Sequence, residues 1–437
     1  MSDNFTNDKP RLFPQGKVLP FILVTALFMF WGIAVNLNDV LIKQFMKSFE
    51  ISRLAAGFVQ TFFFFGYFAL AMPAALIMRK YNYKTGLVIG LFLYATGTVL
   101  FWPAAIIGKY LFFLFALFVI ASGLSFLETG ANPFIATLGD PRTSEQRLNF
   151  SQSFNPLGAI TGVLIGTVFI FSGIELSEAE IAVMKAAGEY DAYLQSEIMR
   201  MVKPYLVIGA VMFLWALLLI RTRFPKSADE QKDADTNGKG RFRDLFRYPH
   251  FVQGVIAQFF YVGAQVGTWS YFIQYIQDYT GEPEKVAGYF LTGSLVAFGV
   301  GRFTATFLMK YIQPQKLMGI YGIINVVLVG IGVIYPGWIG LWAVFFTSFF
   351  MSLMFPTIFA LGIKELGSNT KIGGSMIIMA IVGGAALTPV MGLIADQTGS
   401  MALAMLVPLG CYVFITYYAF IGSKVRKIRG MERLNDL

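Results

Sequence analysis

Long uninterrupted apolar runs constrain this chain more than any other feature. The runs Leu19–Ile42, Tyr110–Leu138 and Phe251–Gln277 each contain at most one charged residue. A helix of about 20 apolar residues crosses a bilayer and satisfies its own backbone polar groups. The runs are too long for transmembrane β-strands, which need only about 10 residues. Only 14% of the residues are charged, against about 25% in soluble domains. We therefore predict an all-α polytopic membrane protein in contact with the lipid bilayer.

The apolar pattern predicts twelve transmembrane spans: Leu19–Lys43, Arg53–Arg79, Lys84–Pro103, Tyr110–Leu138, Leu148–Phe171, Tyr205–Leu219, Phe251–Gln277, Val286–Met309, Lys316–Tyr335, Ile339–Ile363, Ile372–Ala395 and Ala402–Ile421. When the connections are assigned to alternate sides, 25 of the 34 Lys and Arg residues fall on the side that holds both termini. Basic residues favour the cytoplasm, so we expect both termini to be cytoplasmic. This asymmetry also explains the net charge of +9 without a nucleic-acid partner.

Two polar segments interrupt the apolar pattern. Arg221–His250 contains "KSADEQKDADTNGKGRFRD" and predicts a cytoplasmic linker between two sets of six spans. Glu175–Lys203 predicts the longest external loop, acidic at first and partly helical. The chain has one Cys and one His, which makes a Cys- or His-ligated metal centre a poor candidate. We expect no metal and no cofactor.

Three short matches equate each span with the span six places later. "NPFIATLG" at 132–139 matches "FPTIFALG" at 355–362, "MRKY" at 78–81 resembles "LMKY" at 308–311, and "FWPA" at 101–104 resembles "IYPG" at 334–337. Two parallel six-span halves are the plan of the major facilitator fold, whose substrate site lies near the midplane between the halves. We therefore expect an N-terminal half at 1–220, a linker at 221–250, and a C-terminal half with a cytoplasmic tail at 251–437.

Asp39, Glu128 and Arg302 are the ionisable residues expected deep inside spans. Each costs about 2.5–3.5 kcal/mol at a helix centre, so such groups usually face a cavity and have a function. At 1.5 Å per residue the two acids differ by roughly 15–20 Å in depth, too far for a catalytic pair. A buried carboxyl binds a proton more readily than one in water. This favours proton carriers, with Asp39 on the entry side and Glu128 near the substrate. Arg302 is a candidate gate residue or charge partner.

Amides and aromatic rings recur at helical spacing near these acids. Asn36 shares a helix face with Asp39, and Asn132 shares one with Glu128. The further candidate substrate-binding residues are Trp31, Gln152, Asn155, Gln258, Tyr261, Gln265 and Trp269. Amides and a carboxylate complement sugar hydroxyls, and flat rings stack on the C–H face of a sugar. Each amide could instead join neighbouring helices.

Several blocks, in order along nearly the whole chain, resemble the L-fucose:proton symporters of the major facilitator superfamily. They are "FWGIAVNLNDVLIKQF", "GLFLYATGTVLFWPAA", "LETGANPFIATLG", "LNFSQSFNPLGAI", "AQFFYVGAQVGTWSYFIQY", "GRFTATFL" and "FPTIFALGIKELG". The resemblance implies that Asp39 and Glu128 are the protonatable pair, that Glu128 also contacts sugar, and that Asn36, Gln152 and Asn155 are polar cavity residues. It further implies a bacterial inner-membrane importer, which we expect to function as a monomer. Gly130 and the "VGTW" stretch around Trp269 depart from the expected pattern.

The sequence therefore predicts proton-coupled import of a neutral monosaccharide, L-fucose in the first instance. The alternatives are a proton-coupled glucose/galactose or N-acetylglucosamine transporter of the same family, and a proton/drug antiporter. An intramembrane enzyme is disfavoured by the depth gap between the acids and by the lack of a Ser/His nucleophile arrangement.

Overall fold

Helices carry all of the regular structure in the residues that the computed structural model describes, which are 18–51, 53–172, 174, 176–225, 242–282 and 284–425. The first group of helices is α1 (Val18–Phe49), α2 (Arg53–Lys80), α3 (Tyr83–Val99), α4 (Phe101–Ile107), α5 (Tyr110–Thr137), η1 (Pro141–Thr143), α6 (Ser144–Gln152), α7 (Asn155–Ile165), η2 (Gly166–Ile170), α8 (Glu178–Ala187) and α9 (Tyr190–Arg221). The second group is α11 (Phe242–Leu245), α12 (Pro249–Thr280), α13 (Glu284–Leu308), α14 (Pro314–Ile334), α15 (Trp338–Met351), α16 (Met354–Gly362), η3 (Gly367–Asn369), α17 (Thr370–Met379), η4 (Ala380–Val382), α18 (Gly383–Thr398), α19 (Met401–Ala404), α20 (Leu406–Tyr417) and η5 (Tyr418–Gly422).

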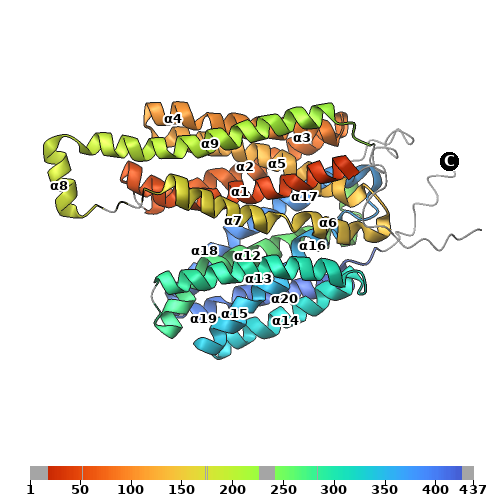
Figure 1. Ribbon diagram of the computed structural model, residues 1–437. Coiled ribbons are helices and arrows are strands. Elements are labelled where there is room, and N and C mark those ends of the chain that lie inside the picture. The colour runs from red at the N-terminus through yellow and green to blue at the C-terminus, as the bar shows by residue number, and fades with distance from the viewer. Residues whose placement is uncertain are drawn as a thin grey trace, which may run out of the picture.

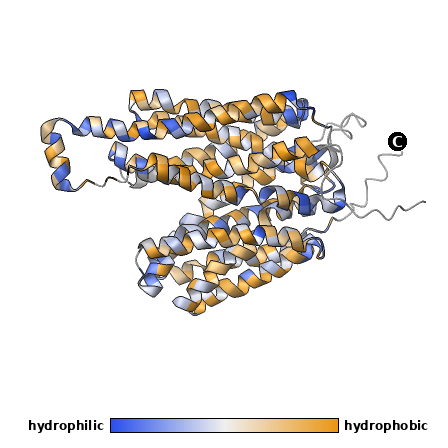
Figure 2. Ribbon diagram, in the orientation of Figure 1, coloured by the Kyte–Doolittle hydropathy of each residue, from blue (hydrophilic) through white to orange (hydrophobic). Residues whose placement is uncertain are grey.

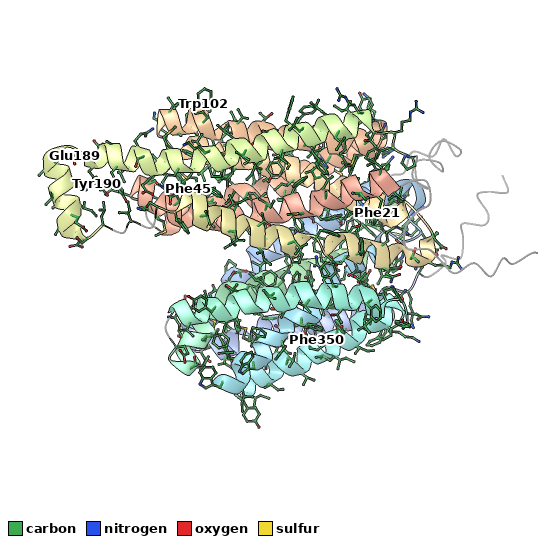
Figure 3. All side chains as sticks on the ribbon, in the orientation of Figure 1. Phe21, Phe45, Trp102, Glu189, Tyr190 and Phe350 are labelled. Atoms are coloured by element: carbon green, nitrogen blue, oxygen red, sulfur yellow. The ribbon has the colours of Figure 1, made fainter. Side chains whose placement is uncertain are left out.

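Eleven segments of the described chain are long and apolar enough to cross a membrane. The twelfth long helix, α12, has 32 residues and is therefore about 48 Å long. The glutamines of α12 lower its mean hydropathy, but the helix is long enough to cross a membrane. Hydrophobic residues cover the outward faces of both groups of helices (Figure 2). Trp102 is 52% exposed whereas Phe45 is fully buried between helices (Figure 3). The all-helical membrane architecture expected from the apolar runs is confirmed.

The helices form two groups that lie side by side (Figure 1). We call the side where α9 ends and α12 begins the linker side, and the opposite side the α8 side. α17 lies against α2 and α5 of the first group, so it joins the two groups on the linker side. Within each group an equivalent glycine permits close packing. A Cβ at Gly158 of α7 would overlap the Met29 carbonyl oxygen of α1, and a Cβ at Gly383 of α18 would overlap the Phe259 carbonyl oxygen of α12.

Among the spans that the sequence predicts as continuous, the fifth and the tenth have breaks that contribute to the site. The fifth span is interrupted between α6 and α7, just before Pro156, and the tenth between α15 and α16, just before Pro356. Proline has no N–H and therefore cannot bond the carbonyl four residues earlier. The two breaks free the carbonyl groups of Gln152 and Ser352, both of which contribute to the site described below.

The segment before the sixth span is more ordered than the loop expected there. α9 begins at Tyr190 and runs unbroken to Arg221, so the polar residues before Tyr205 extend the span on the α8 side. Glu197 in this extension is 1% exposed. Its carboxylate accepts a hydrogen bond of 2.9 Å from Gln44 and lies 3.3 Å from the Lys47 ammonium. The sequence prediction of three deeply placed ionisable residues therefore omitted Glu197.

Candidate functional site

Glu128 lies on α5 and its side chain is 4% exposed. Neither carboxylate oxygen has a hydrogen-bond partner among the described residues. The hydroxyl of Tyr67, on α2, lies near both this carboxylate and the indole of Trp31 on α1. Buried polar atoms nearly always have partners. An acid, an indole N–H and a phenol that converge from three helices are therefore candidate ligand-binding groups.

A chain of hydrogen bonds joins the Glu128 segment to the second group of helices. The Asn132 amide donates to the Glu128 backbone carbonyl at 3.0 Å, and the Gln152 amide donates to the Asn132 side-chain oxygen at 2.7 Å. The Arg302 guanidinium then donates to the Gln152 backbone carbonyl at 3.0 Å. Four sequence-predicted residues from α5, α6 and α13 thus lie in one connected network.

Arg302 bonds to the carbonyl groups that the two prolines leave without helical partners. Its Nη1 donates to Gln152, four residues before Pro156, and its Nε donates at 2.8 Å to the Ser352 carbonyl, four residues before Pro356. The Phe298 ring covers the guanidinium, 4.6 Å from ring centre to Cζ. No carboxylate of the described residues lies within ion-pair distance of Arg302. Its positive charge is therefore met by carbonyl dipoles from both groups of helices.

Aromatic rings from both groups meet around Phe355 of α16. The ring centroids of Trp31 and Tyr261 lie 6.4 Å and 6.1 Å from that of Phe355. The hydroxyl of Tyr261 and both amide atoms of Gln258 are buried and have no hydrogen-bond partner in the described part of the chain. Together with Trp31, Tyr67 and Glu128, these side chains offer both donors and acceptors beside flat rings.

The other sequence candidates whose bonds the structure describes have partners within their own group of helices. The Asn36 amide donates to the Gly32 carbonyl of its own helix at 2.9 Å, and Asn155 donates to the Phe28 carbonyl at 3.2 Å. Trp269 donates to the Ser348 hydroxyl at 3.0 Å and packs on Phe298. Gln265 is half-buried on α12. Asp39 belongs to α1, but its side chain is not among those that the structure describes.

Sequence reasoning missed Tyr67 and Phe355. Both lie in aromatic-rich runs, "FFFFGYFAL" and "LMFPTIF", where no spacing or charge distinguishes them. It also missed Arg147, which is fully buried and donates to the Ile135 and Ala136 carbonyls at the end of α5. The described residues contain no group of three His, Cys, Asp or Glu side chains that could hold a metal ion.

Several polar contacts hold the two groups of helices together on the linker side. Glu145 of α6 forms an ion pair of 3.2 Å with Lys364, and the Asn149 amide donates to the Thr357 hydroxyl at 3.0 Å. The Gln146 amide donates to the Thr306 carbonyl at 3.0 Å. Together with the Arg302 contact, these bonds place the junction of the groups between the Glu128 level and the linker-side surface.

The model of the Major Facilitator Superfamily matches residues 21–371. The chain belongs to the major facilitator superfamily. Its twelve-helix fold is that of this family of transporters, and it is a multi-pass membrane protein rather than an enzyme. The family assignment and the fold class predicted from the sequence are both confirmed.

Within the superfamily, the chain is similar to several named sugar transporters. The chain is 42% identical to the L-fucose-proton symporter of Escherichia coli (strain K12), over 95% of this chain and 96% of that protein. It is 35% identical to the glucose/galactose transporter of Brucella abortus, over 92% of this chain and 93% of that protein. A crystal structure of a major facilitator superfamily transporter, FucP, in the outward conformation matches with a TM-score of 0.83 and 40% identity, over 93% of this chain and 99% of that chain.

Proposed function

We propose that this protein imports a neutral monosaccharide together with a proton, and that the sugar is L-fucose. The observation that carries the proposal is Glu128, a buried carboxyl without a hydrogen-bond partner among the described residues, beside Tyr67 and Trp31. The similarity to the Escherichia coli L-fucose-proton symporter supports the choice of sugar. Among the described residues, Arg302 is the one arginine that bonds to the Gln152 and Asn132 network. A phosphate site usually holds several cations, so this argues against phosphorylated substrates.

In this proposal the sugar binds between Trp31, Tyr67 and Glu128 of the first half and Gln258 and Tyr261 of the second. Asn132, Gln152 and Asn155 position the polar wall of the site, and Asn36, Gln265 and Trp269 contact the substrate nearer the α8 side. Asp39 takes up the proton, and Glu128 couples protonation to sugar binding. Protonation changes a carboxylate from an acceptor only to a donor and acceptor, so it changes which sugar hydroxyl contacts are favourable.

The transport cycle is then a rocking of the halves 1–220 and 251–437 about the site, joined by the linker 221–250. The contacts between the halves on the linker side support an outward-facing conformation, in agreement with the similarity to FucP in the outward conformation. We place the linker side and both termini in the cytoplasm of a bacterial inner membrane, and we propose that one chain suffices for transport. Each charge moved inward gains about 2.3 kcal/mol per 100 mV, equivalent to almost two decades of sugar gradient.

A glucose/galactose substrate is the second candidate, because the Brucella abortus relative carries that name. N-acetylglucosamine is the third sugar to compare. Competition of labelled L-fucose uptake by glucose, galactose and N-acetylglucosamine in proteoliposomes distinguishes these substrates. The sugar that competes at the lowest concentration is the preferred one.

The coupling test replaces each acid by its amide. In Glu128→Gln and Asp39→Asn proteins, uptake driven by an imposed pH gradient should fall to background, whereas sugar exchange without net proton flow should persist. The matched control is Glu178→Gln, because Glu178 is exposed on α8 outside the site. Full gradient-driven accumulation in both amide variants would refute the assignment of the acids.

A further inference from the structure

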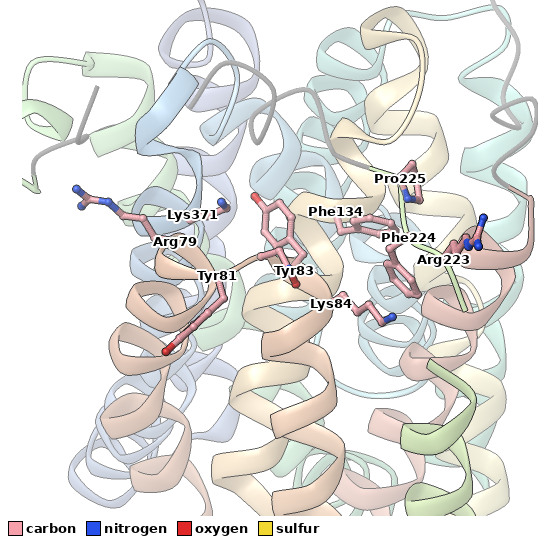
Figure 4. A pocket seen from close by; sticks show the side chains of 10 residues that line it. Arg79, Tyr81, Tyr83, Lys84, Phe134, Arg223, Phe224, Pro225 and Lys371 are labelled. Atoms are coloured by element: carbon pink, nitrogen blue, oxygen red, sulfur yellow. The ribbon is translucent and has the colours of Figure 1, made fainter. Parts of the chain in front are cut away.

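A second candidate site lies at the linker side, away from Glu128. A pocket of about 570 Å³ opens where α2 ends, α3 begins and α9 ends (Figure 4). Its lining includes four basic residues, Arg79, Lys84, Arg223 and Lys371. In the view of Figure 4, Arg79 and Lys371 lie on one side of Tyr83, and Lys84 and Arg223 lie on the other. The sugar-transport scheme assigns no role to this pocket.

The pocket concentrates positive charge. None of its described lining residues is Asp or Glu. The N-terminus of α3, which Asn82 caps by accepting from the Thr85 N–H at 2.7 Å, lies in the pocket lining, so the positive end of the α3 dipole adds to the positive charge. The Lys84 ammonium is fixed by the Ile220 and Thr222 carbonyls at 2.8 Å and 2.9 Å. Lys371 is only 3% exposed, with its ammonium 5.2 Å from the centre of the Tyr83 ring.

The position of the pocket indicates which kind of anion it binds. It lies at the ends of membrane-spanning helices, the level at which lipid phosphates are found. Ile220 and Tyr81 beside it are exposed on the outer surface of the bundle, so acyl chains can lie against the protein while the headgroup enters. Basic pockets between transmembrane helices at the cytoplasmic face are suited to anionic headgroups. We propose that this pocket binds the phosphodiester headgroup of an anionic phospholipid.

The bound headgroup would contact both halves of the protein. Lys371 belongs to α17 of the second half, whereas Arg79, Lys84 and Arg223 belong to the first half. A phosphodiester in the pocket attracts basic side chains of both halves. The lipid therefore stabilises the conformation in which the halves meet on the linker side.

The test measures lipid binding to the full-length protein in neutral detergent, by native mass spectrometry with phosphatidylglycerol as the probe. The test variant is Arg79→Gln/Arg223→Gln. The matched control is Lys80→Gln/Arg221→Gln, because these exposed neighbours carry the same charge but do not line the pocket. Each lining arginine should contribute about fivefold in affinity, so the test variant should bind about 25-fold more weakly and the control should bind like the unmodified protein.

Two comparisons make the result decisive. Equal weakening in both double variants would show diffuse attraction to the basic surface and would overturn the proposal, as would unchanged binding in the test variant. Phosphatidylcholine and inorganic phosphate are the other two probes. We expect neither to raise the melting temperature, whereas phosphatidylglycerol raises that of the unmodified protein and not that of the test variant. Stabilisation by inorganic phosphate equal to that by phosphatidylglycerol would assign the pocket to a soluble anion and overturn the lipid proposal.

Discussion

Arg302 offers the sharpest test of how the two halves are held together. Its Nη1 donates to the Gln152 carbonyl of the first half at 3.0 Å, and its Nε donates to the Ser352 carbonyl of its own half at 2.8 Å. Replacing Arg302 with Met removes both bonds. Replacing it with Lys keeps the charge but loses the planar arrangement of donors that reaches two carbonyls at once.

The size of the effect follows from the contact across the halves. A hydrogen bond to a charged group contributes about 1.5–3 kcal/mol. Only the bond to Gln152 is broken when the halves separate, since Ser352 moves with Arg302. Its loss should therefore shift the equilibrium away from the linker-side-closed conformation by roughly 10- to 150-fold. The Lys variant should show a smaller shift, because one ammonium can keep one of the two bonds.

Distances between spin labels on the linker side report this equilibrium. The exposed residues Arg142 of the first half and Gln313 of the second can be changed to Cys for labelling. Cys411 is the only native cysteine and is buried. The matched control is Arg200→Met, because Arg200 also donates to two carbonyls, those of Ile170 and Phe171 at 3.0 Å each, but entirely within the first half.

The Arg302→Met protein should gain a population with a longer label distance that neither the unmodified protein nor Arg200→Met contains. A distance distribution identical to that of the unmodified protein would refute the inference that this guanidinium holds the halves together. A shift of the same size in Arg200→Met would refute it as well, because that change leaves the junction intact.

Two further predictions concern packing and surface charge. Glu145→Gln should produce a smaller shift in the same label distances, below about 1 kcal/mol, because Lys364 is 39% exposed; the difference from the unmodified protein should decrease in high salt. Gly158→Ala and Gly383→Ala should each destabilise the protein by about 1–3 kcal/mol through overpacking against a neighbouring carbonyl. Gly410→Ala, with open space around it, should raise the melting temperature slightly, and equal effects at the three glycines would contradict the packing argument.

The membrane spans were predictable because bilayer insertion depends on local apolar length, which the sequence displays directly. The breaks at Pro156 and Pro356 were not predictable in the same way. Pro73, Pro133, Pro204 and Pro389 also lie inside long helices, yet those helices continue through them. At Gln152 and Ser352 the freed carbonyl is bonded by an arginine from a distant segment, and local sequence does not reveal that partner.

The site was predictable to the extent that helical spacing determines it. Asn132 lies one turn from Glu128 as expected, and its amide bonds the Glu128 carbonyl. Contacts between helices, such as Gln152 with Asn132 and Arg302 with Gln152, depend on tertiary packing that one sequence does not encode locally. Tyr67 and Phe355 could not be singled out for a simpler reason. The chain has 45 Phe and 20 Tyr residues, so one more aromatic residue in an apolar run does not indicate a site.

The hydrogen-bond network also restricts how protonation of Glu128 can influence the junction. Asn132 bonds the backbone carbonyl of Glu128 and not its carboxylate, so a proton on the carboxylate does not break the chain that leads to Arg302. The carboxylate instead lies near the Tyr67 hydroxyl, and that hydroxyl also lies near Trp31, which packs with Phe355. In the proposed mechanism the coupling must therefore pass through the sugar, whose hydroxyls can bond the carboxyl on one side and Gln258 or Tyr261 on the other. A proton alone should then leave the linker-side label distances unchanged, and a proton together with sugar should change them.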